Sequence, residues 1–262
     1  AGITGQAQAC PQEDGLSAIK NRPDIRNEKG ENRPMNPLLS DEQIKALAAI
    51  DTPTVCNAIE AFDVRGRVEG FFGMDIRCLS PELGVMTGYA VTARVDASTP
   101  GAPPNQAAWE DWVRAMDGAP KPVVLVFQDV GPNPRRSAHC GEVMATLARR
   151  LGTVGLVTDG GVRDILEVRG LGFHYFAAGL VPSHGTTRFL EVNVPVTLDG
   201  VHIQPGDLIH GDINGVTTIP AEIAGQVVEA AQRVREREAG VMAYTRDPDF
   251  SLEGFFLRMF AH

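Results

Sequence analysis

The sequence predicts a layered α/β domain, on two observations. From about residue 105 to residue 177, helical and strand patterns alternate, which is typical of a sheet covered by helices. After residue 190, several short strand patterns follow one another before a last helix. The 262 residues, 43% apolar and 22% charged, are enough to bury one full core and carry extensions.

Three segments are expected along the chain. Residues 1–38 are polar, lack a sustained period and predict an N-terminal arm. Residues 39–240 contain the helical and strand patterns and predict the domain itself. Residues 241–262 are rich in phenylalanine. They predict a tail that docks on the domain or on a neighbouring subunit, because such side chains suit a protein surface better than water.

The domain is expected to open with two helices. Ser40 and Gln43 form a capping-box pattern ahead of apolar residues at helical spacing. Thr52 and Pro53 predict a second helix start, since proline is favoured at the first helical position.

A strand at Val85–Val95, a helix at Asn105–Met116 and a buried strand at Pro122–Gln128 are expected next. Asp129–His139 predicts a loop. One face of that helix is expected in the core and carries Trp109, Trp112, Val113 and Met116.

The stretch from Gly141 to Glu167 predicts helix, strand, turn and helix in succession. A helix begins near Gly141 and Glu142 and ends near a pair of arginines, where cations suit the helix dipole. Thr153–Thr158 is apolar and β-branched, which predicts a buried strand. Asp159–Gly161 predicts a turn, and Val162–Arg169 predicts the next helix.

The rest of the domain predicts short strands and one helix. Asp199 and Gly200 indicate a hairpin turn. The last helix is expected from Pro220 to about Glu238. The expected strands are Phe173–Ala177, Val194–Leu198, Val201–Ile203, Asp207–His210 and Val216–Ile219.

Three charged residues form the candidate site. Glu142 opens one predicted helix, and after twenty residues Arg163 and Asp164 stand between a strand and the next helix. Open α/β sheets bind ligands at this edge. Carboxylates suit Mg²⁺ or Mn²⁺, and a guanidinium suits an anionic substrate. The alternative is that Asp164 caps a helix and Arg163 forms a surface ion pair.

The stretch from Gly141 to Phe173, with Glu191–Pro220 downstream, resembles the RraA-like family. That family includes class II pyruvate aldolases, the regulator of ribonuclease E activity and members labelled demethylmenaquinone methyltransferases. Its aldolases carry an acidic residue, twenty residues, then Arg-Asp, as this chain does from Glu142 to Asp164. The resemblance covers about residues 39–240. It implies a swivelling-domain-like α-β-β-α sandwich assembled as a homotrimer or homohexamer.

The resemblance also implies roles for individual residues. Asp164 would bind Mg²⁺ or Mn²⁺ directly, and Glu142 would hold a water on the metal. Arg163 would contact the substrate's oxygens and stabilise a pyruvate enolate. The amides of Glu142, Val143 and Met144, beside Gly141, would hold the substrate carboxylate. Glu238 is the candidate for the catalytic Glu that a neighbouring subunit supplies.

Two features leave the substrate open. The aldolases have Asp where this chain has Glu142, which puts the identity of the substrate in doubt. In the predicted loop, Arg135, Arg136 and His139 are candidates for a second substrate carboxylate, with a solvated loop charge as the alternative. His139 is also a weak candidate for a general base.

Composition excludes several classes of protein. A net charge of −9 without a basic cluster argues against nucleic-acid binding. No apolar run is long enough for a membrane span. The four cysteines are too widely spaced for a zinc site, and Cys140 is expected to be a packing residue. We expect a cytoplasmic location, with export as the alternative because an A-x-A pattern at Ala7–Ala9 precedes Cys10.

Together with the candidate site, the resemblance implies a metal-dependent lyase. It would cleave a small 2-oxo acid by a retro-aldol reaction, or decarboxylate oxaloacetate, through an enolate. One alternative is a non-catalytic RraA-like protein that regulates a partner. Another is a lyase or hydratase acting on a different 2-oxo or sugar acid.

Overall fold

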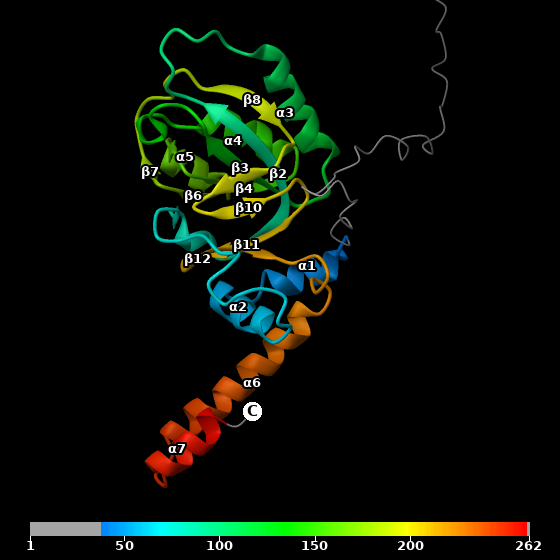
Figure 1. Ribbon diagram of the computed structural model, residues 1–262, viewed down its shortest axis with the longest axis vertical. Coiled ribbons are helices and arrows are strands. Elements are labelled where there is room, and N and C mark those ends of the chain that lie inside the picture. The colour runs from blue at the N-terminus through cyan, green and yellow to red at the C-terminus, as the bar shows by residue number, and fades with distance from the viewer. Residues whose placement is uncertain (1–37, 261–262) are drawn as a thin grey trace, which may run out of the picture. The chain divides into compact units, whose positions relative to one another are not determined.

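The computed structural model describes residues 38–260 (Figure 1). All but the last residue of the predicted arm, including Ala7–Cys10, lies outside these residues. The described part contains seven α-helices, one mixed eight-stranded sheet and two two-stranded sheets, which confirms the predicted α/β class. Within the described part, no helix has the length and apolar character needed to cross a membrane.

The central sheet is parallel in its middle and antiparallel at its edges. Its order is β1-β6-β4-β3-β2-β11-β12, and β8 pairs with the far end of β2. The pairs β2–β3, β3–β4 and β4–β6 are parallel, as expected for strands joined by helical crossovers. The strands are β1 Arg77–Cys78, β2 Met86–Asp96, β3 Val123–Asp129, β4 Thr153–Thr158, β6 His174–Ala177, β8 Arg188–Val192, β11 Leu208–Asp212 and β12 Gly215–Ile219.

The two faces of the sheet are covered differently. Val123, Leu125 and Phe127 point to one face, where α3 (Gln106–Gly118), α4 (Glu142–Arg150) and α5 (Ile165–Gly170) pack. Alternate residues Val124 and Val126 point to the other face. That face is covered by a hairpin of β9 (Val196–Leu198) and β10 (Val201–Ile203). The central strands β3 and β4 are mainly apolar because both of their faces are buried.

A second group of helices packs beside the β2–β11–β12 part of the sheet (Figure 1). It consists of α1 (Asp41–Leu47), α2 (Thr52–Glu60) and α6 (Val227–Thr245). Buried polar contacts tie α2 to β11: Thr52 donates its amide to Asp212 Oδ2 at 2.9 Å, and His210 Nδ1 lies 3.0 Å from Thr52 Oγ1. The last helix, α7 (Leu252–Met259), contacts α6.

Several predicted boundaries need correction. The helix expected from Val162 begins only at Ile165, because Gly161–Val162 form strand β5, which pairs with β7 (Gly179–Leu180). Residues 221–226 form turns, so α6 begins at Val227. This helix runs on to Thr245 and crosses the predicted boundary at residue 240.

Of the four residues predicted to be buried on one face of α3, two are fully buried, one is partly buried and one is exposed. Trp112 and Met116 are fully buried, and Val113 is partly buried. Trp109 is 42% exposed, because it lies at the edge of α3 beside a cavity rather than over the sheet. The strand β8, which sequence patterns did not predict, carries Phe189 into the same region.

Candidate functional site

Two loops run side by side and bring the candidate residues together. The backbone amide of His139 donates to Gly161 O at 2.8 Å, and that of Arg163 donates to Cys140 O at 3.1 Å. Ala138 and Gly161 form a parallel bridge, in which Gly161 also donates its amide to Ser137 O at 3.2 Å. The loop that enters α4 therefore lies against the loop that leaves β4.

Gly141 lies where these loops approach most closely. A Cβ atom at this position would lie 2.5 Å from Asp164 Oδ2 and 2.9 Å from Arg163 Nε. Real Cβ atoms do not approach other atoms this closely, so only glycine leaves room for both side chains. Gly141 is therefore a spacer that allows the two charged side chains to reach the start of α4.

Asp164 has a left-handed backbone conformation, with φ 56° and ψ 42°. Asp adopts this conformation more readily than most residues, at a modest cost. Its Oδ2 accepts a hydrogen bond of 2.9 Å from the amide of Glu142 and lies 3.6 Å from Arg163 Nε. Because Gly141 has no side chain to cap α4, Asp164 caps that helix from 22 residues away.

This bond changes the predicted anion site. The amide of Glu142 is directed at Asp164, so it does not serve the substrate carboxylate as expected. The intrahelical bonds begin with Ala145, whose amide donates to Gly141 O at 3.0 Å. The amides of Val143 and Met144 precede it and have no partner one turn back, which leaves them for an anion.

The residues around Asp164 fit a hard divalent cation. Asp164 is 36% exposed, and among the described residues its Oδ1 makes no hydrogen bond or ion pair. The described residues contain no group of three or more His, Cys, Asp or Glu side chains placed to hold a metal. A cation on Oδ1 would therefore take its other oxygen ligands from water, from substrate or from a second copy.

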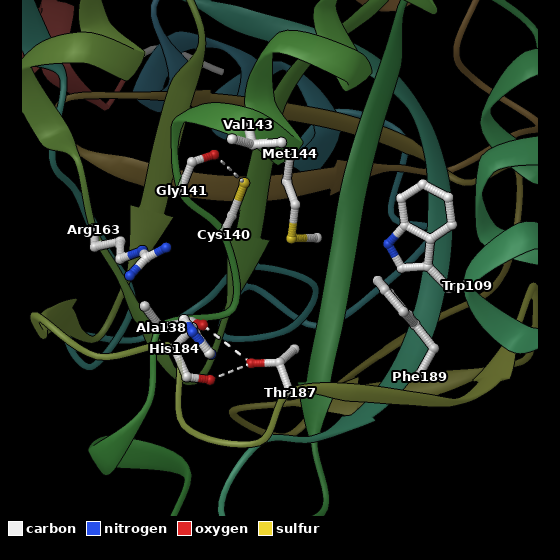
Figure 2. A pocket seen from close by; sticks show the side chains of 10 residues that line it. All are labelled: Trp109, Ala138, Cys140, Gly141, Val143, Met144, Arg163, His184, Thr187 and Phe189. Atoms are coloured by element: carbon white, nitrogen blue, oxygen red, sulfur yellow. Dashed lines mark hydrogen bonds between the residues drawn. The ribbon is translucent and has the colours of Figure 1, made fainter. Parts of the chain in front are cut away.

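A cavity of about 210 Å³ opens beside this loop pair. In Figure 2, Arg163 and His184 lie on one side of it, and Trp109 and Phe189 lie on the other. Met144 points into the space between them. The lining residues are Trp109, Ala138, Cys140, Gly141, Val143, Met144, Arg163, His184, Thr187 and Phe189.

Glu142 and Asp164 belong to the edge of this site rather than to the cavity wall. Neither is among the described residues that line the cavity, although Gly141 and Arg163, their neighbours in the chain, are. Glu142 is exposed at the start of α4. The structure thus brings Glu142, Arg163 and Asp164 to one place, as predicted.

The predicted second anion contacts lie elsewhere. Arg135 donates to Asp75 Oδ2 at 3.2 Å and lines a different cavity, of about 330 Å³. Arg136 is exposed in the short 3-10 turn Pro134–Arg136 and does not line the first cavity. The expectation that either reaches a substrate carboxylate in the site of this chain is therefore wrong.

His139 is a structural residue, not a base open to substrate. Its side chain is fully buried, with Nε2 2.7 Å from Asp129 Oδ2 and Nδ1 2.7 Å from Thr158 Oγ1. Both ring nitrogens are occupied, and the ring lies against Gly160. The expectation that His139 contacts substrate or acts as a base on it is thus wrong, because the loop turns its side chain inward.

Asp159 lies beside this buried pair. It accepts the amide of Asp129 on Oδ1 at 2.9 Å. Burial disfavours its carboxylate and raises the pKa of Asp159 to about 6, even though this hydrogen bond and His139 act in the opposite direction. The carboxyl group sits one residue after β4, under the turn that leads to Arg163.

Cys140 behaves as the sequence predicts. Its side chain is 2% exposed, and burial raises the pKa of the thiol to about 12. A thiol of this kind is not a nucleophile at neutral pH. It packs in the core beneath the site.

Glu238 lies away from the cavity of its own chain. It is on α6 and accepts a hydrogen bond of 3.2 Å from Asn57 Nδ2 on α2. Its predicted catalytic role requires a neighbouring subunit and remains a prediction.

Sequence reasoning missed part of the cavity wall. Phe189 lies on β8, whose sequence RFLEV alternates too briefly to stand out as a strand. His184 and Thr187 come from the loop before it. The sequence carried no signal for this wall, because Trp109 falls on the predicted core face and its exposure appears only in the structure.

Comparisons with known proteins identify relatives of this chain. A protein of Halalkalibacterium halodurans provisionally named a 4-hydroxy-4-methyl-2-oxoglutarate aldolase is 36% identical over 128 residues, which are 48% of this chain and 59% of that protein. The chain spans less than two thirds of the length of the curated relatives that it matches first.

Solved structures share the fold. An uncharacterized protein of Pseudomonas syringae has a TM-score of 0.67 at 23% identity, covering 86% of this chain and 97% of that one. RraAS2 of Streptomyces coelicolor, described as an unusual member of the RNase ES inhibitor RraA family, has a TM-score of 0.61 at 22% identity, covering 78% and 96%. The model of the RraA-like family, Aldolase/RraA, matches residues 52–218. The chain therefore belongs to the RraA-like family.

Proposed function

We propose that this protein is a divalent-metal-dependent lyase that cleaves a small 2-oxo acid through an enolate. The observation that carries the proposal is the bond between the Glu142 amide and Asp164 Oδ2. It places a helix start, a guanidinium and a partly exposed carboxylate together at a cavity. This combination suits an anionic substrate that chelates a metal.

Asp164 would hold Mg²⁺ or Mn²⁺ through Oδ1, with Glu142 assisting through a water. The cation would supply Lewis-acid polarisation of the substrate's keto and carboxylate oxygens. The amides of Val143 and Met144 would orient the carboxylate at the start of α4. Arg163 lies in the cavity wall and would donate to the keto oxygen as it becomes an enolate oxygen.

The bond between C3 and C4 of the substrate breaks in this reaction. Its electron pair becomes the enolate of pyruvate, and the C4 hydroxyl loses its proton to form the second carbonyl product. Glu142, exposed beside the site, would accept that proton through a water. The enolate would then take a proton at C3 and leave as pyruvate.

Assembly completes the proposal. We propose a homotrimer or homohexamer in which Glu238 of one copy reaches the site of another. In support, α6 has no buried residue after Val234, so the segment that carries Glu238 is open to a second chain. Size-exclusion chromatography with light scattering would measure the assembly.

The test is pyruvate release from oxaloacetate and from 4-hydroxy-4-methyl-2-oxoglutarate, with Mg²⁺ or Mn²⁺ and with EDTA. Metal-dependent release supports the proposal. Asp164→Asn is the decisive variant, because Asn keeps an oxygen for the Glu142 amide and tolerates the left-handed backbone but removes the charge. We expect it to retain the fold and lose at least about 100-fold in kcat/KM.

A matched control exists in the chain. Asp63 is exposed and also left-handed, with φ 50°, but lies at the end of α2. Asp63→Asn should leave turnover and metal binding unchanged. If Asp164→Asn also leaves both unchanged, Asp164 is not the ligand.

A non-catalytic interaction protein is the second candidate, favoured by the fold it shares with RraAS2 of Streptomyces coelicolor. Absence of turnover together with absence of metal binding would support it. Turnover of a different 2-oxo or sugar acid would instead support another lyase or a hydratase.

A further inference from the structure

The cavity beside Arg163 has a polar side and an apolar side. Arg163 and the exposed His184 form the polar side, where the substrate's 2-oxo acid group would bind. Trp109 and Phe189 form the opposite side, and Met144 points between the two (Figure 2). A ligand held by Arg163 would therefore extend its far end towards aromatic rings.

The aromatic side is rigid. Phe189 stacks on the buried Trp112, with ring centroids 4.9 Å apart and an interplanar angle of 17°. Trp109 lies 6.0 Å from Trp112 on the same helix, and Phe189 meets Phe127 of β3 edge to face at 5.4 Å. The rings at the cavity are thus fixed by a buried cluster before any ligand arrives.

The part of the cavity wall that this chain provides offers little to a second carboxylate. Among the described residues, Arg163 is the only Lys or Arg in its wall. His184, the other basic side chain, lies on the Arg163 side. A carboxylate placed against Trp109 and Phe189 would lose its hydration without gaining a partner, which is costly. An apolar group in the same place would gain by leaving water.

We infer that the substrate is a 2-oxo acid with one carboxylate, whose far end is a compact apolar or aromatic group rather than a second carboxylate. This inference rests on the proposed function for the reaction itself. The cavity, of about 210 Å³, lies below the roughly 300–1,000 Å³ of sites for drug-sized ligands, so it suits a small acid. Trp109, Phe189 and Met144 select its far end.

The first test compares kcat/KM for 4-hydroxy-2-oxo-4-phenylbutanoate with that for the dicarboxylate 4-hydroxy-4-methyl-2-oxoglutarate, both with Mg²⁺. We expect the phenyl substrate to be preferred by at least about 10-fold, the scale on which apolar pockets discriminate. Preference for the dicarboxylate would overturn the inference.

Two variants separate specificity from general damage. Trp109→Ala should lower kcat/KM at least about 10-fold for the phenyl substrate and less than about 3-fold for the dicarboxylate. Met144→Arg keeps an unbranched side chain of similar helix propensity but lengthens it and adds a cation between the two sides, so it should shift the preference towards the dicarboxylate by about 10-fold or more. Equal losses on both substrates in Trp109→Ala would contradict the assignment.

Phe71→Ala is the matched control. Phe71 is 40% exposed, close to the 42% of Trp109, and does not line the cavity. It should leave the preference unchanged.

Binding distinguishes failure of this inference from failure of the lyase proposal. Calorimetric titration with Mg²⁺ would compare 4-methyl-2-oxopentanoate with 2-oxoglutarate, neither of which has the C4 hydroxyl that the cleavage needs. Tighter binding of the apolar acid without any turnover would support the specificity and reject the lyase. Tighter binding of 2-oxoglutarate would reject the proposed preference for an apolar far end, whether or not the protein cleaves any substrate.

Discussion

Gly141→Ala tests whether activity depends on the close approach of the Arg163 and Asp164 side chains to Gly141. The change adds one methyl group and removes no charge, no hydrogen-bonding side chain and no candidate ligand. The backbone at Gly141, with φ −140°, is open to alanine, so the methyl group itself is the whole perturbation. It would lie 2.5 Å from Asp164 Oδ2 and 2.9 Å from Arg163 Nε.

The cost in stability should be small. Both side chains are 36% exposed, so they can swing away from the methyl group into solvent. The protein then loses the cap that Asp164 provides to α4, which is worth about 1 kcal/mol. For a chain of this size, that corresponds to a fall in Tm of roughly 2–4 °C.

The cost in activity should be large. Displacing Arg163 and Asp164 by about 1 Å is enough to lower kcat/KM by roughly 100-fold. The assay is pyruvate release with Mn²⁺, paired with thermal unfolding of the same sample. Gly118→Ala is the control, because a Cβ at Gly118 meets nothing within 4 Å. Activity within about threefold of wild type in Gly141→Ala would refute the argument that the close approach matters.

Two further predictions concern the buried groups behind the site. Gly160→Ala forces a methyl group into the imidazole of His139, which is held at both nitrogens. Urea unfolding should therefore show a free energy of unfolding about 2–4 kcal/mol lower than that of wild type. A decrease below about 1 kcal/mol would contradict this prediction. The pKa of Asp159 is raised to about 6, so the folded protein binds its proton more tightly than the unfolded chain does. The resulting stabilisation is fully present below about pH 4 and is lost as the pH rises through 6. Burial, with Arg149, lowers the pKa of His174 to about 4, so its contribution is present above about pH 6.5 and is lost as the pH falls through 4. Asp159→Asn removes the contribution of Asp159 and leaves that of His174. The stability of the variant, measured as the urea midpoint, should therefore rise more steeply between pH 4 and 6.5 than that of wild type. Parallel pH profiles of the urea midpoint in the two proteins would refute this.

Local chemistry made some elements predictable. The capping box of Ser40 and Gln43 is present in the structure as a reciprocal pair of hydrogen bonds, and α1 begins where it predicts. β4 has the predicted bounds because its apolar, β-branched run is buried on both faces. The positions of Glu142, Arg163 and Asp164 follow from the same local patterns.

Contacts between distant segments were not predictable in this way. The functional and structural interpretations of Asp164 appear as alternatives in the sequence, whereas the structure assigns Oδ2 to a cap and leaves Oδ1 open. The helix that Asp164 caps is α4, not the helix it precedes, and no single segment carries that information. The inward turn of His139 likewise depends on Asp129 and Thr158, which reach it from two strands.

The exposed Trp109 shows the limit of periodicity. Helical spacing places Trp109 on the same face as Trp112, but Trp112 is fully buried whereas Trp109 stays 42% exposed. Phe189, on a strand 80 residues later, lines the same cavity as Trp109, and both rings pack on Trp112. The lining of the cavity thus arises from tertiary packing.

The most direct test of the central claim is exchange of the pyruvate methyl protons for deuterium in D₂O, followed by proton NMR. Exchange requires the enolate and does not depend on knowing the second half of the substrate. The account predicts enzyme-dependent loss of the methyl signal with Mg²⁺ or Mn²⁺, abolished by EDTA and by Arg163→Lys, and retained in the exposed control Arg150→Lys. No exchange above the uncatalysed rate, with metal bound at Asp164, would contradict it.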